Sequence, residues 1–458
     1  MPTDVRHLID LVPEDVLGIC RRLSEKGKRG WIVGGCVRDL LRGRPAKDWD
    51  VCTDARPEEV VSFFRKVIPT GIQHGTVTVV VRGVHYEVTT LRGEGAYSDG
   101  RRPDKVEFVD DITADLARRD FTFNAMAIDP IDGHLIDPFG GEQDLEARVL
   151  RAVGDAAERF FEDGLRVLRA ARFSATLECS IAPGTERAMG APRSLDTFRR
   201  VSAERVRDEW MRAMTAKQPS VAFEAMRRSA LLDITCPELT ATIGVEPGEG
   251  PDDDVYHRAL ACLDVCKAEP ILRVAALLHD VGKPRARAAA EPTQSLALPD
   301  HARLGAEMAE AILTRLKFSN DERARVTALI RHHVIGYSSS WTDAAVRRWI
   351  RRITPELAPD LYELGFAVAR SQGGDPGAVE ELRRRVTGLL AAGTALSTRD
   401  LALNGRELMT TLDLKPSRII GETLEHLLEL VTDDPSLNER EKLLAAARAR
   451  IAEPRPAS

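Results

Sequence analysis

The spacing of hydrophobic and polar positions divides the chain near residue 150. Before that point, the apolar run at 31–33 predicts a strand, and helical spacing at 37–41 predicts a helix directly after it. An alternating stretch at 76–91 predicts a β-hairpin that turns at Arg82-Gly83, and the residues at 57–67 have the spacing of another helix. We therefore expect the first 150 residues to form a small α/β head.

After residue 150 the strand signals stop, and apolar residues recur at helical spacing almost to the end of the chain. Three polar stretches interrupt this pattern, at 244–254, 285–300 and 371–377. The expected fold class is α+β, with the α/β head followed by an all-α neck, body and tail. The expected domains are 1–150 (head), 151–243 (neck), 251–377 (helical body) and 378–458 (helical tail).

Composition narrows the classes of function. With 65 basic and 71 acidic residues the formal net charge is −6, which argues against a protein that coats nucleic acid indiscriminately but leaves room for a local basic groove. The seven cysteines show no CxxC pair or zinc-finger spacing, so we expect reduced core residues. No run of about 18 apolar residues and no signal-peptide core is found, which predicts a cytoplasmic protein without membrane spans.

A pair of carboxylates is the first sign of chemistry. Asp48 and Asp50 are two residues apart in a predicted strand, so both side chains should project from one face. Two hard oxygen ligands side by side suit Mg²⁺, which binds a few carboxylates together with substrate phosphates. Gly34 and Gly35 lie between a strand and a helix, where the backbone can approach a phosphate, and Arg38 follows one turn later.

Glu87 lies in the predicted hairpin and offers a third carboxylate. A solvent-facing strand residue explains it equally well, and the sequence leaves both interpretations open.

Four motifs in order resemble one enzyme family. The segments GGCVRD…KDWDVCT (34–53), ARRDFTFNAMA (117–127), FFEDGLRVLRAARF (160–173) and SAERVRDEW (202–210) are similar to the signature of bacterial-type (class II) tRNA nucleotidyltransferases and poly(A) polymerases. The resemblance covers about the first 210 residues. It implies a polymerase β-like nucleotidyltransferase head with Mg²⁺ held by Asp48 and Asp50.

The chemistry of the second and third motifs agrees with this resemblance. Arg118, Arg119, Asp120 and Asn124 cluster in a segment that is too polar for a core, and they suit ribose and triphosphate contacts. Asp163, Arg166 and Arg169 recur every three residues, which predicts one shared helix face whose acceptors and donors match a base edge. Surface ion pairs would give the same spacing.

The resemblance gives further residues a role. It implies nucleotide binding by Gly34, Gly35, Arg38, Arg119, Asp120, Asn124, Asp163, Arg166, Arg169 and Arg172, with support from Glu87, Arg118, Glu162, Glu204 and Arg205.

Two features favour one branch of the family. The stretch at 99–103 resembles the flexible loop of enzymes that add CCA to tRNA, and 401–434 is similar to their tail. The expected reaction transfers CMP and AMP from CTP and ATP to the 3′ end of tRNA, with neither DNA nor membrane as a partner. A poly(A) polymerase and a specialised CC- or A-adding enzyme remain alternatives, and the oligomeric state is not predicted.

Histidines recur across the helical half of the chain. Segments at 254–260, 277–284, 300–305 and 330–334 resemble an HD-type phosphohydrolase domain in their order. The resemblance implies a second site for a divalent transition metal, with ligands or close neighbours among His257, His279, Asp280, His301 and either His332 or His333.

One departure affects this second site. The last ligand of such domains is an aspartate on a later helix, but the corresponding stretch at 368–374 contains none before Asp375. Either Asp375 substitutes, or the metal site is incomplete and the helices serve as a structural body. This site leaves two alternatives open. The protein has an HD phosphohydrolase activity in addition to nucleotide transfer, or it is an HD phosphohydrolase whose head only binds nucleotides.

Overall fold

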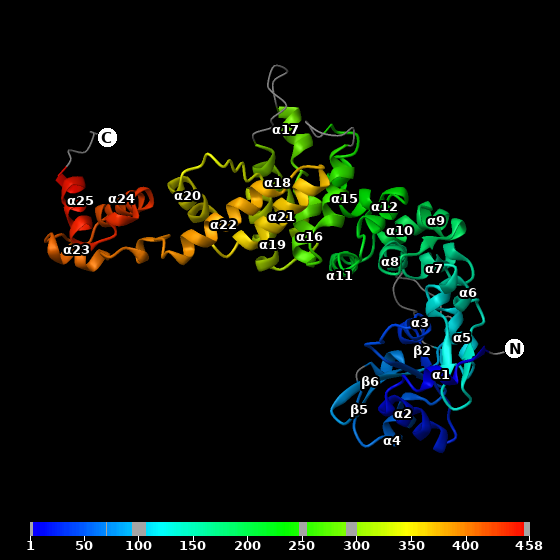
Figure 1. The fold of residues 1–458 in the computed structure, drawn as a ribbon. Helices are drawn as coiled ribbons and strands as arrows, with labels where there is room; N and C mark the ends of the chain where they lie inside the picture. Colours follow the sequence, from blue (N-terminus) through cyan, green and yellow to red (C-terminus); the bar gives the residue numbers. More distant parts are fainter. Residues whose placement is uncertain (1–2, 70, 94–106, 247–253, 290–299, 453–458) are drawn as a thin grey trace. The chain divides into compact units, whose positions relative to one another are not determined.

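A computed structural model describes residues 3–69, 71–93, 107–246, 254–289 and 300–452 (Figure 1). The chain divides into two compact units, Met1–Thr240 and Ala241–Ser458. The expected flexible loop at 99–103 lies outside the described residues. Within the described part, no helix is long and apolar enough to cross a lipid bilayer.

The described residues of the first unit contain a mixed eight-stranded sheet in the order β1-β8-β7-β2-β3-β6-β5-β4. Neighbouring strands are antiparallel except β3 and β6, which are parallel. The strands are β1 (Thr3–Asp4), β2 (Gly30–Val33), β3 (Asp50–Thr53), β4 (Val67–Ile68), β5 (Thr76–Val81), β6 (Val84–Thr90), β7 (Ala127–Asp129) and β8 (His134–Ile136).

The helices of the head cover both faces of this sheet. Trp31 and Val33 of β2 lie in one apolar cluster with Leu116 of α5 (Ile112–Ala117). Because side chains alternate along a strand, Ile32 points to the opposite face, where α2 (Glu14–Glu25) and α4 (Pro57–Phe63) pack (Figure 1). This packing leaves the ends of β2 and β3 rigidly placed.

The hairpin predicted at Arg82-Gly83 is confirmed. Strands β5 and β6 are joined by these two residues, with φ of 50° and 86°, which is the left-handed geometry of a tight two-residue turn. The antiparallel register then fixes the position of every side chain on β6.

Two expectations for secondary structure were wrong. The helix expected at 57–67 ends at Phe63, because Val67–Ile68 instead pairs with β5 at the edge of the sheet. Strand pairing also continues past residue 150: β9 (Val149–Leu150) pairs in parallel with β10 (Ser180–Ile181). Both strands are only two residues long, too short for an alternating pattern to show in the sequence.

The rest of the first unit is mainly helical, and helices were expected after residue 150 but not at Arg6–Ile9 or Gly141–Glu146. Its main helices are α1 (Arg6–Ile9), α3 (Gly35–Leu41), α6 (Gly141–Glu146), α7 (Ala156–Glu162), α8 (Leu165–Thr176), α9 (Pro183–Met189), α10 (Pro192–Phe198), α11 (Ala203–Ala213), α12 (Ser220–Arg228), α13 (Leu231–Thr235) and α14 (Pro237–Thr240), with the 3₁₀ turn η2 (Thr122–Asn124). Helix α8 packs against α11 and α12, which hold its buried face.

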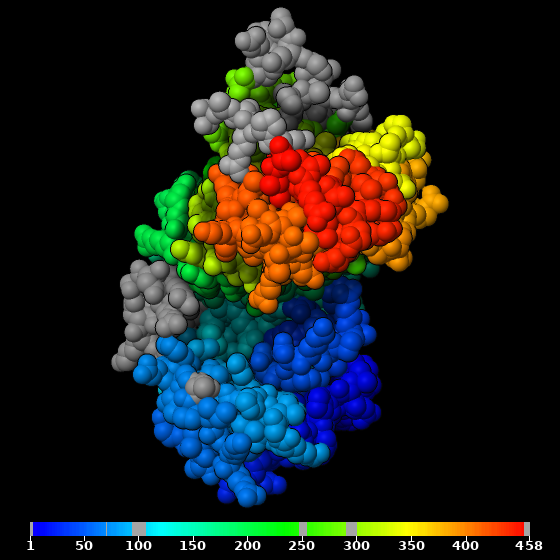
Figure 2. Space-filling view, turned by 90° about the vertical axis from the view of Figure 1, so that its left-hand side faces the viewer, coloured from blue at the N-terminus to red at the C-terminus, as the bar shows by residue number. Residues whose placement is uncertain are grey.

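The described part of the second unit consists of helices: α15 (Val255–Val265), α16 (Pro270–Leu278), α17 (Lys283–Ala289), α18 (His301–Arg315), α19 (Asn320–His332), α20 (Asp343–Ile353), α21 (Ala358–Ser371), α22 (Gly377–Ala391), α23 (Gly405–Thr411), α24 (Arg418–Asp433) and α25 (Arg440–Ala452). The last three share an apolar cluster around Leu408, Leu427 and Leu443. They form the rounded group drawn in orange and red in Figure 2.

All seven cysteines are free and buried, as the sequence predicts. Burial raises the pKa of the Cys20, Cys52 and Cys266 thiols to about 12, because a thiolate cannot be solvated in an apolar core.

Candidate active site

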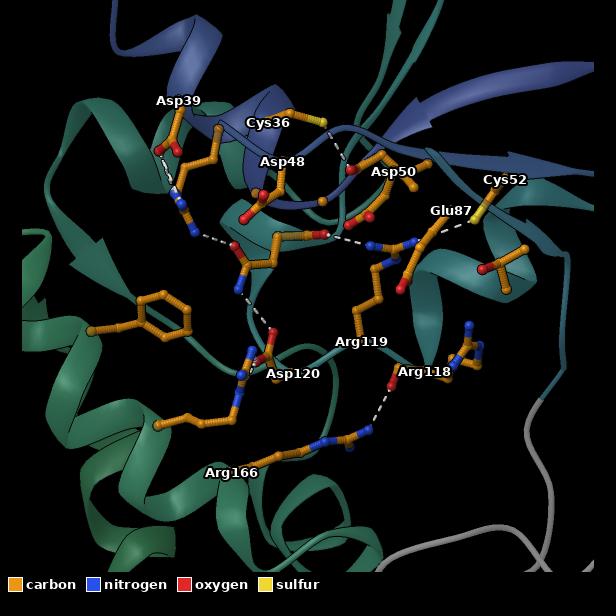
Figure 3. A pocket seen from close by; sticks show the side chains of 18 of the residues that line it. Cys36, Asp39, Asp48, Asp50, Cys52, Glu87, Arg118, Arg119, Asp120 and Arg166 are labelled. Atoms are coloured by element: carbon orange, nitrogen blue, oxygen red, sulfur yellow. Dashed lines mark hydrogen bonds and ion pairs between the residues drawn. The ribbon is translucent and has the colours of Figure 1, made fainter. Parts of the chain in front are cut away.

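A cavity of about 950 Å³ opens within the first unit. Its walls come from α3, the ends of β3 and β6, the segment around η2, and the helices α8 and α11 (Figure 3). It gathers nearly all the head and neck residues that the sequence singles out. The described lining includes all of those except Glu162 and Glu204.

Three carboxylates lie on one wall. Asp50 is the first residue of β3, and Glu87 is its register partner on the parallel strand β6. Asp48 also lines the cavity, but it precedes the strand, which corrects the expectation that both aspartates lie in β3. Burial, Glu87 and Asp48 raise the pKa of the Asp50 carboxyl, against the opposing charge of Arg119. A cation bound here would relieve this repulsion, so the three carboxylates fit Mg²⁺.

The glycine pair brings α3 close to these carboxylates. Gly34 follows β2 with φ of 81°, a conformation that a side chain disfavours. A Cβ atom on Gly34 would lie 3.0 Å from Nη1 of Arg119 and 3.8 Å from a carboxylate oxygen of Asp50. Glycine therefore keeps the space between Arg119 and Asp50 open.

A chain of hydrogen bonds joins α3 to α8 across the floor of the cavity. Arg38 donates to Oδ1 of Asn124 (2.9 Å), and the amide of Asn124 donates to Oδ1 of Asp120 (3.0 Å). Arg169 of α8 donates to Oδ2 of the same aspartate (2.8 Å). The pKa of Asp120 is lowered to about 2: burial opposes the shift, but Arg169 and Asn124 outweigh it. Two guanidinium groups are thereby fixed at opposite ends of one polar chain.

Asp163 does not share the α8 face with Arg166 and Arg169, contrary to the expectation. Its φ of −140° places it in the break between α7 and α8, where it caps the backbone N–H of Leu165. Its other oxygen accepts from Arg205 of α11 (2.8 Å). The helix period missed this break because the two helices are separated by only two residues.

Arg166 is hydrogen-bonded to three oxygens of the protein. It donates to Glu162 (2.6 Å) and to the backbone oxygen of Arg159 (3.0 Å). It also donates to the backbone oxygen of Arg118 (2.8 Å), as Figure 3 shows. In this arrangement it braces α7, α8 and the arginine pair of the head. Glu162 supports the cavity through this bond.

The support expected from Glu204 is provided by another residue of the same motif. Glu204 is exposed at the start of α11, whereas the buried Glu209 pairs with Arg172. Arg172 in turn stacks on Phe173, with 3.6 Å between its guanidinium carbon and the ring centre.

Sequence reasoning also missed Asp115, a fully buried carboxylate that pairs with Arg118 and Arg119. Its spacing of three and four residues from the arginines was the available signal.

Comparisons with known proteins cover both halves of the chain. Residues 30–151 match the poly A polymerase head domain, 180–243 the probable RNA and SrmB-binding site of polymerase A, and 295–447 the putative tRNA nucleotidyltransferase domain 2. The CCA-adding enzyme of Limosilactobacillus fermentum is 33% identical over 443 residues, which are 94% of this chain and 95% of that protein. The chain belongs to the CCA-adding enzyme family.

Other members of the family match more strongly over shorter spans. The CCA-adding enzyme of Lactobacillus delbrueckii subsp. bulgaricus is 42% identical over 264 residues, and the match spans 56% of this chain and 66% of the relative. For Lactobacillus johnsonii the identity is 46%, over 45% of this chain and 52% of the relative. These two matches cover between half and two thirds of the length of the relatives.

A solved structure shares the whole fold. The crystal structure of the Bacillus stearothermophilus CCA-adding enzyme in complex with CTP superimposes with a TM-score of 0.72 at 29% identity, over 96% of this chain and 97% of that one. The expected nucleotidyltransferase head with a helical body is therefore confirmed.

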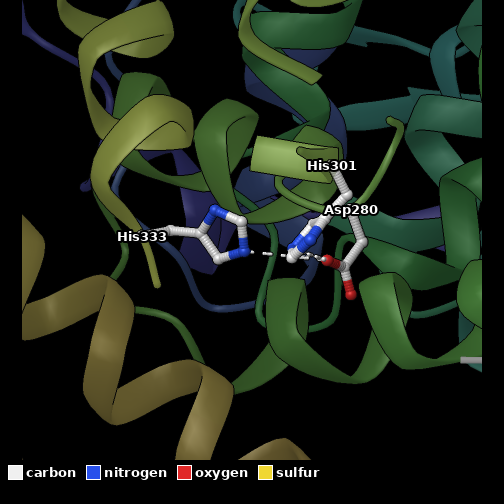
Figure 4. Close-up of side chains that lie close together, drawn as sticks. All are labelled: Asp280, His301 and His333. Carbon is white, nitrogen blue, oxygen red and sulfur yellow. Dashed lines mark ion pairs between the residues drawn. The ribbon is translucent and has the colours of Figure 1, made fainter. Parts of the chain in front are cut away.

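The second unit of this CCA-adding family member contains a cluster of histidines around Asp280 (Figure 4). The buried carboxylate of Asp280 lies 3.2 Å from Nε2 of His279, 3.5 Å from Nε2 of His301 and 3.6 Å from Nε2 of His333. Lys283 also contacts it, at 2.7 Å. Ligand atoms of Asp280, His301 and His333 lie within 4.8 Å of one another, a spacing that suits one metal ion.

The backbone fixes the tautomer of two of these rings. Nδ1 of His279 lies 2.7 Å from the oxygen of Ala276, and Nδ1 of His333 lies 2.7 Å from that of Ile330. A ring that donates Nδ1–H to a carbonyl presents the lone pair of Nε2, which is how metal-binding histidines are commonly oriented. Gly282 makes room for the cluster, since a side chain there would meet the backbone of His301 and Gly305.

Three expected ligands lie elsewhere. His332 is not part of the cluster, because it is the neighbouring His333 that points to Asp280. His257 is half exposed and pairs with Asp254, which caps α15. Asp375 is exposed and accepts from the backbone of Gly377 at the start of α22. The side chain of Asp375 is thus engaged in capping α22, and it is not among the three residues whose ligand atoms lie together.

Proposed function

We propose that this protein transfers CMP and AMP from CTP and ATP to the 3′ end of tRNA and releases pyrophosphate. The observation that carries the proposal is the single cavity in which three carboxylates face an arginine-rich wall, on a chain that belongs to the CCA-adding enzyme family. A solved relative with this fold was crystallised with CTP.

The carboxylates are assigned to metal binding. Asp48 and Asp50 would hold Mg²⁺, and Glu87 lies beside them as a further acceptor. Bound Mg²⁺ activates the attacking hydroxyl and neutralises charge on the phosphates in this class of reaction. Arg38, Arg118 and Arg119 surround the same space and are assigned to the triphosphate.

The neck wall is assigned to selection of the base. Asp163 lines the cavity from the break before α8, where Arg205 donates to it. Arg169 lines the cavity from α8 itself and donates to Asp120. Fixed donors and acceptors discriminate base edges better than mobile ones, because a wrong base leaves buried polar groups unpaired.

The test uses purified protein with Mg²⁺ and three tRNAs: one lacking CCA, one ending in C and one ending in CC. Each is incubated with CTP alone, ATP alone or both, and the product ends are sequenced. Addition that restores CCA in order and then stops supports the proposal. Addition of only C, or of only A to the CC end, would make this a specialised enzyme, and long A tracts would make it a poly(A) polymerase.

A second function is favoured by the histidine cluster. We propose that Asp280, His279, His301 and His333 bind a divalent transition metal in an HD-type domain, because three of them offer ligand atoms within 4.8 Å and two rings are oriented by backbone carbonyls. Such a site would carry phosphohydrolase activity. Phosphatase and phosphodiesterase activity that survives Asp50→Ala but not Asp280→Ala would support this function, and the absence of metal binding by the wild type would refute it.

A further inference from the structure

Asp115 lies behind the arginine wall of the cavity. It is on the inner side of α5, its side chain is fully buried, and it does not itself line the cavity. A buried carboxylate costs free energy unless charged partners surround it, so its position demands an explanation.

Each oxygen of this carboxylate binds one arginine. Oδ1 accepts from Nε (3.0 Å) and Nη2 (2.6 Å) of Arg118, and Oδ2 accepts from Nη2 of Arg119 (3.2 Å). The backbone N–H of Arg92, two residues after the end of β6, also donates to Oδ1 (3.2 Å). Asp115 therefore ties α5 to the strand that carries Glu87.

The two arginines stand between Asp115 and the cavity. Their side chains retain 18% and 19% exposure, and both line the cavity. Arg119 is attracted from two sides, since Asp50 also acts on its charge from the metal-binding wall. Without Asp115, two guanidinium groups would repel each other and Arg119 would turn toward Asp50.

We infer that Asp115 is a positioning residue for nucleotide binding: it holds Arg118 and Arg119 at the triphosphate and keeps Arg119 from pairing with Asp50. This inference rests on the proposed function. Its specific consequence is that loss of the Asp115 charge weakens two things together, the binding of a nucleoside triphosphate and the binding of Mg²⁺ at Asp50.

The test is CTP binding to the full chain by calorimetry, without tRNA, at several Mg²⁺ concentrations. In Asp115→Asn, which keeps the shape and removes the charge, the Kd for CTP is expected to rise about tenfold, and half-maximal binding should need more Mg²⁺. In transfer assays the KM for CTP should rise while the KM for tRNA stays within about twofold. Asp115→Glu, which retains the charge, should fall between the wild type and Asp115→Asn.

Asp144→Asn is the matched control. Asp144 is also buried and pairs with an arginine, Arg151 (3.0 Å), but neither residue lines the cavity. Equal CTP affinity in Asp115→Asn and wild type, or an equal loss in Asp144→Asn, would overturn the inference. A wild type that binds no CTP would instead refute the proposed function. Thermal unfolding of each variant identifies the temperature at which all are folded.

Discussion

Asp50 and Glu87 occupy the same register position on β3 and β6, the parallel pair of the sheet. Their side chains therefore project from one face of neighbouring strands, toward the cavity that Asp48 also lines. The hairpin turn at Arg82-Gly83 sets a different register, that of β6 with β5, in which Glu87 lies opposite Thr78. The metal-binding wall thus depends on the pairing of β3 with β6, two strands that are distant in the sequence.

The first prediction concerns Asp50→Asn. We expect transfer activity to fall about a thousandfold, because the metal loses a charged ligand. The fold should tolerate the change. The folded-state pKa of Asp50 is raised. At pH values above the ordinary pKa of an aspartate, its negative charge therefore lowers the stability of the folded protein. A neutral amide at this position removes that cost. Thermal unfolding at pH 7 should show an equal or higher midpoint. A large drop in midpoint would contradict this account, as would wild-type turnover.

The second prediction separates backbone strain from crowding at Gly34. Gly34→Ala and Gly43→Ala both place a side chain at positive φ, 81° and 63°, so both should lose unfolding free energy, on the order of 1 to 3 kcal/mol. The loss should be larger at Gly34, whose ψ of −135° lies outside the left-handed region. Only at Gly34 does the new Cβ meet Arg119, since nothing lies within 4 Å at Gly43. The KM for CTP should therefore rise in Gly34→Ala alone. Equal KM values in the two variants would show that the Arg119 side chain moves away from the new methyl group without weakening CTP binding.

The third prediction is a pH dependence. The folded-state pKa of Asp120 is about 2, against the ordinary value of 3.8 for an aspartate. A lowered pKa stabilises the folded protein at pH values above the unfolded pKa, and the stabilisation is lost as pH falls through about 2. Asp120→Asn should therefore lower the unfolding free energy by about 2 kcal/mol at pH 7.

Urea unfolding at a series of pH values checks this prediction. The gap between wild type and Asp120→Asn should stay constant from pH 7 to about 5 and shrink in more acid solution. Asp132→Asn is the control, because Asp132 is exposed and its pair with Arg29 should contribute little. A gap that widens in acid would show the opposite sign of linkage.

The fourth prediction uses two adjacent histidines. His333→Ala should weaken the binding of Mn²⁺ or Zn²⁺ to the helical cluster at least about tenfold, since it removes a ring that faces Asp280. His332→Ala should leave the affinity unchanged, because that ring lies outside the cluster. Calorimetric titration of both variants gives the comparison. Equal losses would place the metal elsewhere.

The sequence predicted the residues of the cavity better than their arrangement. Short spacings along the chain, such as Asp48 with Asp50 and Gly34 with Arg38, bring side chains to the same cavity wall without help from distant segments. The hairpin turn was equally local, because only two residues with positive φ close it.

Contacts between distant segments could not be predicted in the same way. The helix at α4 ends early because β4 pairs with β5, and nothing in the local spacing announces that pairing. The partners of Arg166 lie on α7 and in the head, so its role as a brace appears only once the helices are packed. His332 and His333 are neighbours at the end of one helix, and their side chains point in different directions. Which of them faces Asp280 depends on how the other helices pack, so the sequence alone could not decide between them.

The burial of the seven cysteines makes the chain suitable for site-directed labelling. A maleimide reacts with the thiolate, and buried thiols with raised pKa values react slowly at neutral pH. A cysteine introduced at Val84 or Leu390, which are 50% and 39% exposed, would then be the preferred target while the natural thiols remain in place. A fluorophore attached at Val84, beside the hairpin turn, could report on nucleotide binding without a cysteine-free background.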